Sequence, residues 1–195
     1  GNLDPTKNGG ATGSYIHVFD IGGYPHINGA VNNMLTKGIY ITSTSYSQGC
    51  NLYDVNSQQG DMLSYTNPNL LFVFSGGNNA SGDCNYGAGA GWGNITGGYK
   101  MGKNVIAAAN VDASDIIDAT SSRGPASDGR LKPDIAANGK NQESTNENNT
   151  YQIGGGTSAA CPSIAGTVAM LYQAYRGFNS GVNPEGALIK SILMN

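Results

Sequence analysis

The chain has 195 residues, of which 38% are hydrophobic and 12% are charged, and its formal net charge is −3. A chain of this length can bury a core of useful size, so we expect one domain over residues 1–195. The weak acidity and the absence of a basic stripe argue against nucleic acid as a partner, and no apolar run approaches the ~18 residues of a membrane span.

Strand-like apolar runs alternate with helical patterns along the chain. Buried parallel strands are predicted at 16–21, 39–43, 70–75 and 105–109. Helices are predicted at 29–37 and 54–65, and a third helix follows residue 158. This alternation predicts an α/β layered fold with right-handed crossovers, in which an active site lies at the carboxyl ends of the strands.

The chain contains two histidines. His17 lies in the first predicted strand, and His26 lies in the loop after it. Neither stands in a motif typical of a catalytic base, so we expect ordinary surface or half-buried side chains. Asp20 ends the first predicted strand, where an active-site carboxylate can lie, but we assign it no role.

A serine stands where a glycine-rich loop turns into the third helix. Residues 154–158 read Gly-Gly-Gly-Thr-Ser. The unpaired N–H groups and the positive end of a helix favour an oxyanion beside such a hydroxyl, which an acyl-transfer nucleophile requires. Pro162 has no N–H to give to the Ser158 carbonyl, so the first turn is expected to be irregular. An ordinary glycine loop with a Thr or Ser helix cap is the alternative, whereas a phosphate-binding loop would need a Lys after the glycines.

Four segments of the chain resemble motifs of the subtilisin-like serine proteases, the subtilases. The serine segment resembles the Gly-Thr-Ser-x-Ala-x-Pro nucleophile motif. Further similarities, in family order, are Ser-Gly-Gly-Asn-Asn at 75–79, Ser-Ser-Arg-Gly-Pro with Lys-Pro-Asp-Ile within 121–135, and the closing helix at 183–193. This resemblance implies a three-layer subtilisin-like fold with a mostly parallel sheet, incomplete at its N-terminal side.

The resemblance also implies roles for individual residues. Ser158 matches the nucleophile, and Asn78 matches the residue whose side chain donates to the oxyanion. The substrate cleft of the family is bordered by two strand ends, which correspond here to 45–47 and 75–78. The residues that would line a peptide or protein substrate are Ser45, Tyr46, Ser47 and Gly76. Plain loops at these positions are the alternative.

The triad of the family also needs an Asp and a His that precede the Ser, and neither motif occurs in this sequence. A serine hydroxyl without a base is a poor nucleophile. We therefore expect the chain to be the C-terminal part of a secreted serine endopeptidase domain, partnered by the missing N-terminal part. A catalytically inactive subtilase-like module that binds peptide or protein is the alternative.

The three cysteines divide into two kinds. Cys161 lies in the nucleophile helix and is expected to be a buried free thiol. Cys50 and Cys84 each follow a glycine-bearing segment past a strand end; they could form a disulfide, which would imply an extracellular setting, or remain thiols. No cofactor is expected. No metal-ligand spacing is recognisable, so calcium follows from the family resemblance alone.

The polar segment 139–151 shows no periodicity and predicts an exposed loop that leads to the nucleophile. Glycosylation sequons begin at Asn79, Asn94 and Asn148. A glycan on Asn79 would crowd the cleft beside Asn78, so we expect none there.

Overall fold

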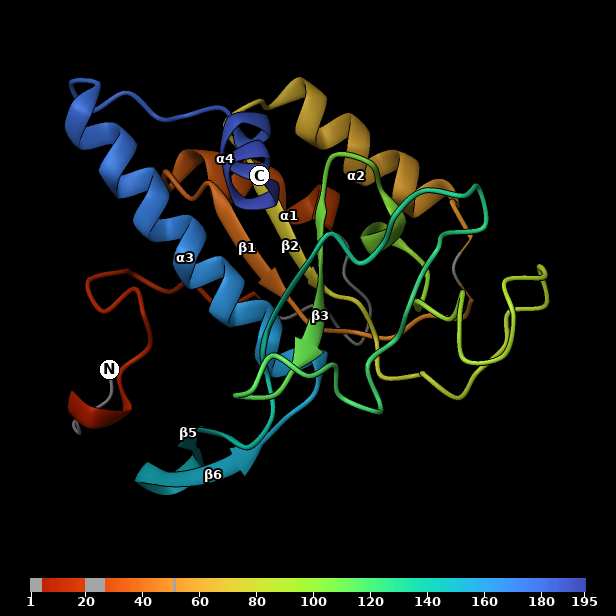
Figure 1. The fold of residues 1–195 in the computed structure, drawn as a ribbon. Helices are drawn as coiled ribbons and strands as arrows, with labels where there is room; N and C mark the ends of the chain where they lie inside the picture. The colour runs from red at the N-terminus through yellow and green to blue at the C-terminus, as the bar shows by residue number, and fades with distance from the viewer. Residues whose placement is uncertain (1–4, 20–26, 51) are drawn as a thin grey trace.

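The computed structural model describes residues 5–19, 27–50 and 52–195 (Figure 1). Its centre is a four-stranded sheet in the order β1-β2-β3-β4. The strands are β1 (Ile41–Thr44), β2 (Leu71–Ser75), β3 (Ile106–Val111) and β4 (Ile135–Asn138). All neighbours pair in parallel, with Val73 opposite Ile106 and Ala108 opposite Ile135. The strands predicted at 39–43, 70–75 and 105–109 are therefore confirmed to within two residues.

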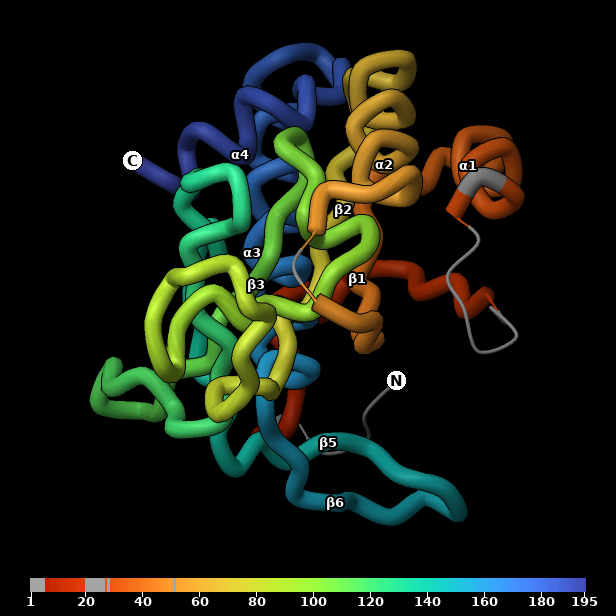
Figure 2. The backbone as a smooth tube through the Cα atoms, turned by 90° about the vertical axis from the view of Figure 1, so that its right-hand side faces the viewer, coloured from red at the N-terminus to blue at the C-terminus, as the bar shows by residue number. Residues whose placement is uncertain are grey.

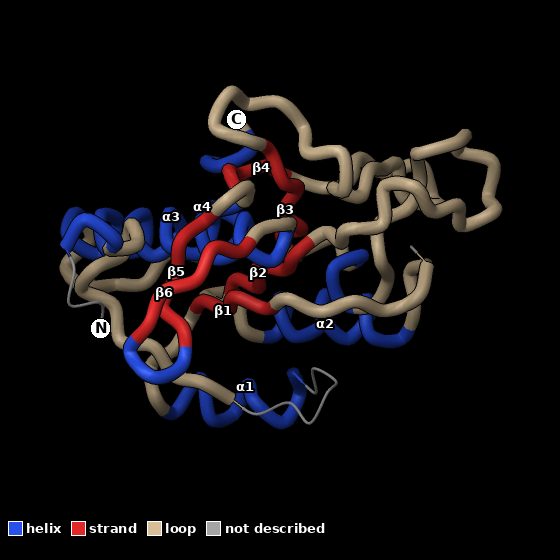
Figure 3. The backbone as a smooth tube through the Cα atoms, turned by 90° about the horizontal axis from the view of Figure 1, so that it is seen from below, coloured by secondary structure: helices blue, strands red, loops and turns tan. Residues whose placement is uncertain are grey.

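Helices cover both faces of the sheet, which Figure 3 shows from below as a middle layer of strands. The helices are α1 (Ile27–Thr36), α2 (Val55–Thr66), α3 (Thr157–Phe178) and α4 (Gly186–Met194). Leu71 and Val73 pack against α3 and α4, whereas Phe72 and Phe74 pack against α1 and α2. Successive residues of a strand point to opposite faces, and both faces of β2 are covered, so its residues 71–74 are all apolar. The predicted three-layer α/β fold is confirmed.

The strand predicted at 16–21 is wrong over its described part. Residues 16–19 have no regular structure, and Tyr15, Ile16 and Val18 are between 85% and 95% exposed. Residues 20 and 21 lie outside the described residues. A strand needs a neighbour to satisfy its backbone groups, and within the described ranges none pairs with this segment.

The loop predicted at 139–151 is instead largely a hairpin that projects from the domain (Figures 1 and 2). It consists of β5 (Gln142–Asn146), the 3₁₀ turn η3 (Glu147–Asn149) and β6 (Thr150–Gly154), and its strands pair antiparallel. Lys7 in η1 (Pro5–Lys7) lies 2.5 Å from the Glu143 carboxylate and 4.2 Å from the centre of the Tyr151 ring. The hairpin leads directly to the glycines before α3.

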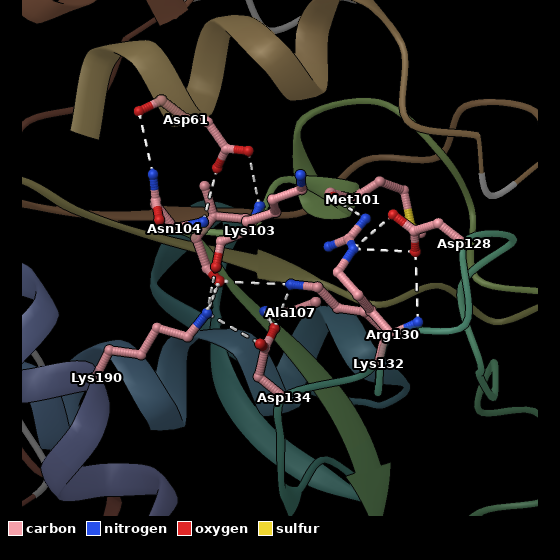
Figure 4. Close-up of polar contacts among 11 residues, drawn as sticks. Asp61, Met101, Lys103, Asn104, Ala107, Asp128, Arg130, Lys132, Asp134 and Lys190 are labelled. Carbon is pink, nitrogen blue, oxygen red and sulfur yellow. Dashed lines mark hydrogen bonds and ion pairs between the residues drawn. The ribbon is translucent and has the colours of Figure 1, made fainter. Parts of the chain in front are cut away.

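A buried carboxylate, Asp134, fixes the start of β3 and the helix α4 to β4 (Figure 4). Its Oδ2 lies 2.5 Å from Lys132 Nζ and accepts the Ala107 N–H, while its Oδ1 lies 3.0 Å from Lys190 Nζ. The side chains of Lys132 and Asp134 are only 2% and 5% exposed. Burial lowers the pKa of Lys132 to about 8, although the charge of Asp134 opposes this shift. The Asp134 carboxylate and the ammonium groups of Lys132 and Lys190 therefore stabilise one another.

Replacement of Asp134 by Asn removes the charge that two lysines share. We expect Asp134→Asn to lower the free energy of unfolding by about 3 kcal/mol, because breaking a buried pair leaves an uncompensated charge. The matched control is Asp128→Asn, since Asp128 pairs with Arg130 where the two side chains are 42% and 25% exposed. That change should cost less than ~1 kcal/mol. Equal losses in denaturant titrations would show that Asp134 does not hold the lysines in place.

Candidate active site

The end of β2 and the start of α3 are joined by hydrogen bonds between residues about 80 positions apart. Thr157, the first residue of α3, donates its N–H and its hydroxyl to Asn78 Oδ1, at 2.9 and 3.1 Å. The same hydroxyl accepts the Gly77 N–H at 3.1 Å. We call these three bonds the Asn78–Thr157 clasp. It supplies an acceptor for the helix start, whose N–H groups have no partner within the helix.

The clasp also explains why the residue before Thr157 is a glycine. Gly156 precedes α3 with φ of 88°, a left-handed conformation that favours glycine. A Cβ at this position would lie 2.9 Å from Asn78 Nδ2. A side chain here would therefore displace Asn78 from Thr157.

Ser158 and Asn78 line one cavity of about 530 Å³. Both residues are exposed, and Ser158 is the second residue of α3. Because Thr157 occupies Asn78 Oδ1, the amide Nδ2 is the group that Asn78 can offer to a bound substrate. The serine hydroxyl, a side-chain amide donor and a helix start thus face the same space, as stabilisation of an oxyanion requires.

The residues after β1 form another wall of this cavity, and they include Ser45, Tyr46 and Ser47. Ser45 Oγ donates to the Ser158 carbonyl oxygen at 3.3 Å. This carbonyl would ordinarily accept the N–H of residue 162, which a proline lacks. Ser45 thus replaces a missing helix bond at Ser158, and α3 continues through Pro162.

Gly76 is not among the described residues that line the cavity, and its predicted contact with substrate stays a prediction. Its N–H donates to the Ala108 carbonyl at 2.8 Å, and its carbonyl accepts the Thr96 N–H at 3.2 Å. A Cβ on Gly76 would lie 2.9 Å from the Ala108 oxygen, so this residue packs against β3. The neighbours Ser75 and Gly77 line the cavity instead.

Two residues of the site have no signal in the sequence. Thr96 lines the cavity, and Lys100 lies behind it in the 3₁₀ turn η2 (Tyr99–Met101). Lys100 is fully buried, and its Nζ donates to Thr96 Oγ1 at 2.9 Å and to the Tyr46 carbonyl at 2.5 Å. Burial lowers the pKa of Lys100 to about 7. A single lysine in a glycine-rich segment is typical of a surface residue, so only the structure reveals this position.

No histidine or carboxylate is among the described residues that line the cavity. His17 is exposed and lies elsewhere, while His26 and Asp20 fall outside the described residues. Within the same described ranges, no group of three His, Cys, Asp or Glu side chains is arranged to hold a metal ion. A calcium site therefore stays a prediction from the family resemblance. None of the described helices combines the length and the apolar character that a membrane span needs.

The three cysteines form one disulfide and one free thiol. Cys50 and Cys84 are joined as a disulfide, with Cα atoms 5.4 Å apart, next to the wall that Gly49 contributes to the cavity. Cys161 is a buried free thiol whose Sγ lies 3.4 Å from the Val73 carbonyl oxygen. Burial raises the pKa of Cys161, which makes this thiol a poor nucleophile.

The predicted sequons differ in their surroundings. Asn94 is fully buried; its Nδ2 donates to the Ala80 carbonyl at 2.9 Å and its Oδ1 accepts the Arg123 N–H at 2.8 Å. Asn94 therefore joins the loop of Asn78 to the segment 121–125, and it is closed to a glycan. Asn79 lines the cavity, and Asn148 is exposed in η3.

Comparison with known proteins places the chain in a class. A family model described as the subtilase family matches residues 1–195. The chain therefore belongs to the subtilase family, as its motifs indicate, and this is a family of serine proteases. At 46% identity over 71 residues it matches the PII-type proteinase of Lactococcus lactis subsp. cremoris, and at 49% over 59 residues that of Lacticaseibacillus paracasei. These matches cover 36% and 30% of this chain but 4% and 3% of those proteins.

Solved structures share the fold. The self-cleaved protease domain of PatA gives a TM-score of 0.66 at 17% identity, over 86% of this chain and 57% of that chain. Sphericase gives a TM-score of 0.62 at 24% identity, over 86% of this chain and 52% of that chain. The chain thus spans little more than half the length of these neighbours, and at these identities the likeness concerns the fold alone.

Replacement of Thr157 tests the Asn78–Thr157 clasp. We expect Thr157→Val to lower the free energy of unfolding by about 1–3 kcal/mol, because the Gly77 N–H and Asn78 Oδ1 each lose a buried partner. Thr157→Ser keeps the hydroxyl and should cost clearly less. Denaturant titrations measure both, and a valine variant as stable as the serine variant would refute the role of the hydroxyl.

The buried ammonium of Lys100 makes stability depend on pH. Its pKa is about 7 in the folded protein and 10.5 ordinarily, so the unfolded chain binds more protons between these values. This group therefore makes the free energy of unfolding rise with pH from about 7 to about 10, by up to about 1.4 kcal/mol per unit of pKa difference. Below pH 7 its contribution is constant and least favourable. In Lys100→Met this contribution to the free energy of unfolding should be absent, so stability should rise less with pH over this range. If denaturant titrations give parallel pH profiles for the two proteins, Lys100 does not have the lowered pKa.

Proposed function

We propose that this chain carries the nucleophile and the oxyanion donors of a serine endopeptidase that hydrolyses peptide bonds through an acyl-enzyme. The observation that carries the proposal is the common cavity of Ser158 and Asn78, whose walls are held together by the Asn78–Thr157 clasp. Membership of the subtilase family supports the same chemistry.

In the proposed reaction, Ser158 Oγ attacks the carbonyl carbon of the substrate and loses its proton to a base. The carbonyl oxygen becomes an oxyanion, which accepts from Asn78 Nδ2 and from N–H groups of the first turn of α3. Collapse of this intermediate breaks the C–N bond, and the amine leaves with a proton. Water then hydrolyses the ester and restores the serine.

We propose that the base comes from the N-terminal part of the catalytic domain, outside these 195 residues. Within the described ranges β1 ends the sheet, so its outer edge is open to a further strand. A segment that pairs along this edge would reach the cavity at the strand ends.

The setting that we propose is extracellular, and the partner is a peptide or protein substrate. The disulfide between Cys50 and Cys84 supports this, because such bonds persist in oxidising compartments. No cofactor is required by the proposed chemistry.

A fluorophosphonate probe, which modifies activated serines, tests the proposal. The chain is expressed alone and together with the segment that precedes it in its precursor. We expect rapid labelling of Ser158 in the longer protein only, because activation needs the base. Ser158→Ala should abolish labelling, and Asn78→Ala should slow turnover by about 10²–10³. Equally fast labelling of both proteins would refute the missing base. Peptide binding without labelling of either would favour the inactive binding module.

A further inference from the structure

The cavity beside Ser158 is unusually polar for a binding pocket. Such sites are generally lined by hydrophobic and aromatic side chains with few polar groups. Here no aliphatic side chain is among the described residues of the wall. The lining residues are Ser45, Tyr46, Ser47, Gly49, Ser75, Gly77, Asn78, Asn79, Thr96, Thr157 and Ser158. This composition fits a substrate side chain that accepts hydrogen bonds.

A positive charge lies directly behind this wall. Lys100 is fully buried, and both partners of its Nζ, the Tyr46 carbonyl and Thr96 Oγ1, belong to residues that line the cavity. Within the described part of the chain, no carboxylate lies within 4.0 Å of this ammonium. A buried charge is costly unless it is paired. The lowered pKa of Lys100 has the same cause, and an anion in the cavity would relieve it.

The hydroxyl of Thr96 connects this charge to the cavity. It accepts from Lys100 Nζ at 2.9 Å, so its own hydrogen is free to be donated elsewhere. Among the described residues its acceptor is the Gly76 carbonyl oxygen, at a long Oγ1–O distance of 3.5 Å. The centre of the Tyr46 ring also lies 4.2 Å from this Nζ, and the ring packs edge-on against Phe74. A carboxylate in the cavity would accept from Thr96 and interact with the charge behind it.

We propose that Lys100 and Thr96 are specificity-determining residues, and that the cavity takes the side chain of Asp or Glu at the substrate residue that precedes the cleaved bond. This inference rests on the proposed function, because Ser158 on the same wall attacks the carbonyl of that residue. Lys100 acts through its charge and Thr96 through a direct hydrogen bond to the substrate carboxylate. The neutral amide of Gln is a poorer ligand, since it gains the hydrogen bond without the charge.

Fluorogenic peptides that differ only at this residue test the inference, with the longer protein that contains the preceding segment. We expect kcat/KM to be at least tenfold higher for Glu than for Gln or Phe. In Lys100→Met, a substitution by an unbranched side chain of similar length, the ratio of kcat/KM for Glu to that for Gln should fall to about one. Lys103→Met is the matched control, because Lys103 is exposed three residues further along, and it should keep the full ratio.

The outcomes separate the inference from the proposed function. If Lys100→Met does not fold, as judged by circular dichroism, Thr96→Val removes the donor at nearly constant volume and should lower the same ratio. An unchanged ratio in the folded variant, or no preference for Glu in the parent protein, overturns the inference. If no peptide is cleaved, the proposed function fails. Calorimetry then measures the affinity of the cavity for peptide amides that end in Glu, Gln or Phe. Equal affinities there also overturn the inference.

Discussion

The Asn78–Thr157 clasp is the constraint on which the site depends. The helix α3 follows a glycine that has no side chain to cap it, so its first N–H needs an acceptor from elsewhere. Asn78 supplies this acceptor from the end of β2. The same bond engages Oδ1 and leaves Nδ2 for the cavity. One set of contacts therefore both starts the helix that carries Ser158 and orients the donor beside it.

Buried polar groups, rather than apolar contacts, hold the loops around this clasp. Glycine-rich loops have little side-chain surface to bury, so their backbone groups must be satisfied individually. Asn94 bonds two of these loops, and the Ser122 hydroxyl accepts the Asn79 N–H at 3.0 Å. Asp134 does the same with charges where α4 meets the sheet. Polar groups thus fix the carboxyl ends of the strands around the clasp and the amino ends of β3 and β4 at Asp134.

The sequence predicts those parts of the structure whose pattern is set locally. The strand β2 and the helix α3 are buried, so the pattern of their apolar residues predicts them. Ser158 and Asn78 each lie in a short motif of consecutive residues, which the sequence displays directly. In contrast, β4 has one large apolar residue, Ile135, and β5–β6 is held by backbone pairing with exposed side chains, so neither shows a period. The apolar run at 16–21 resembles a strand, but pairing depends on a neighbour. Lys100 acquires its position through contact with Tyr46, 54 residues away.

The open edge of β1 has a consequence for handling the protein. Among the described residues no strand pairs with this edge, so its N–H and C=O groups form a template for an extended chain, and a second copy offers the same edge. The solvent-exposed apolar side chains of Tyr15, Ile16 and Val18 add hydrophobic surface through which copies can associate. We therefore expect concentrated solutions of the 195-residue chain by itself to oligomerise and precipitate. The colloidal behaviour of the chain thus depends on what pairs with this strand.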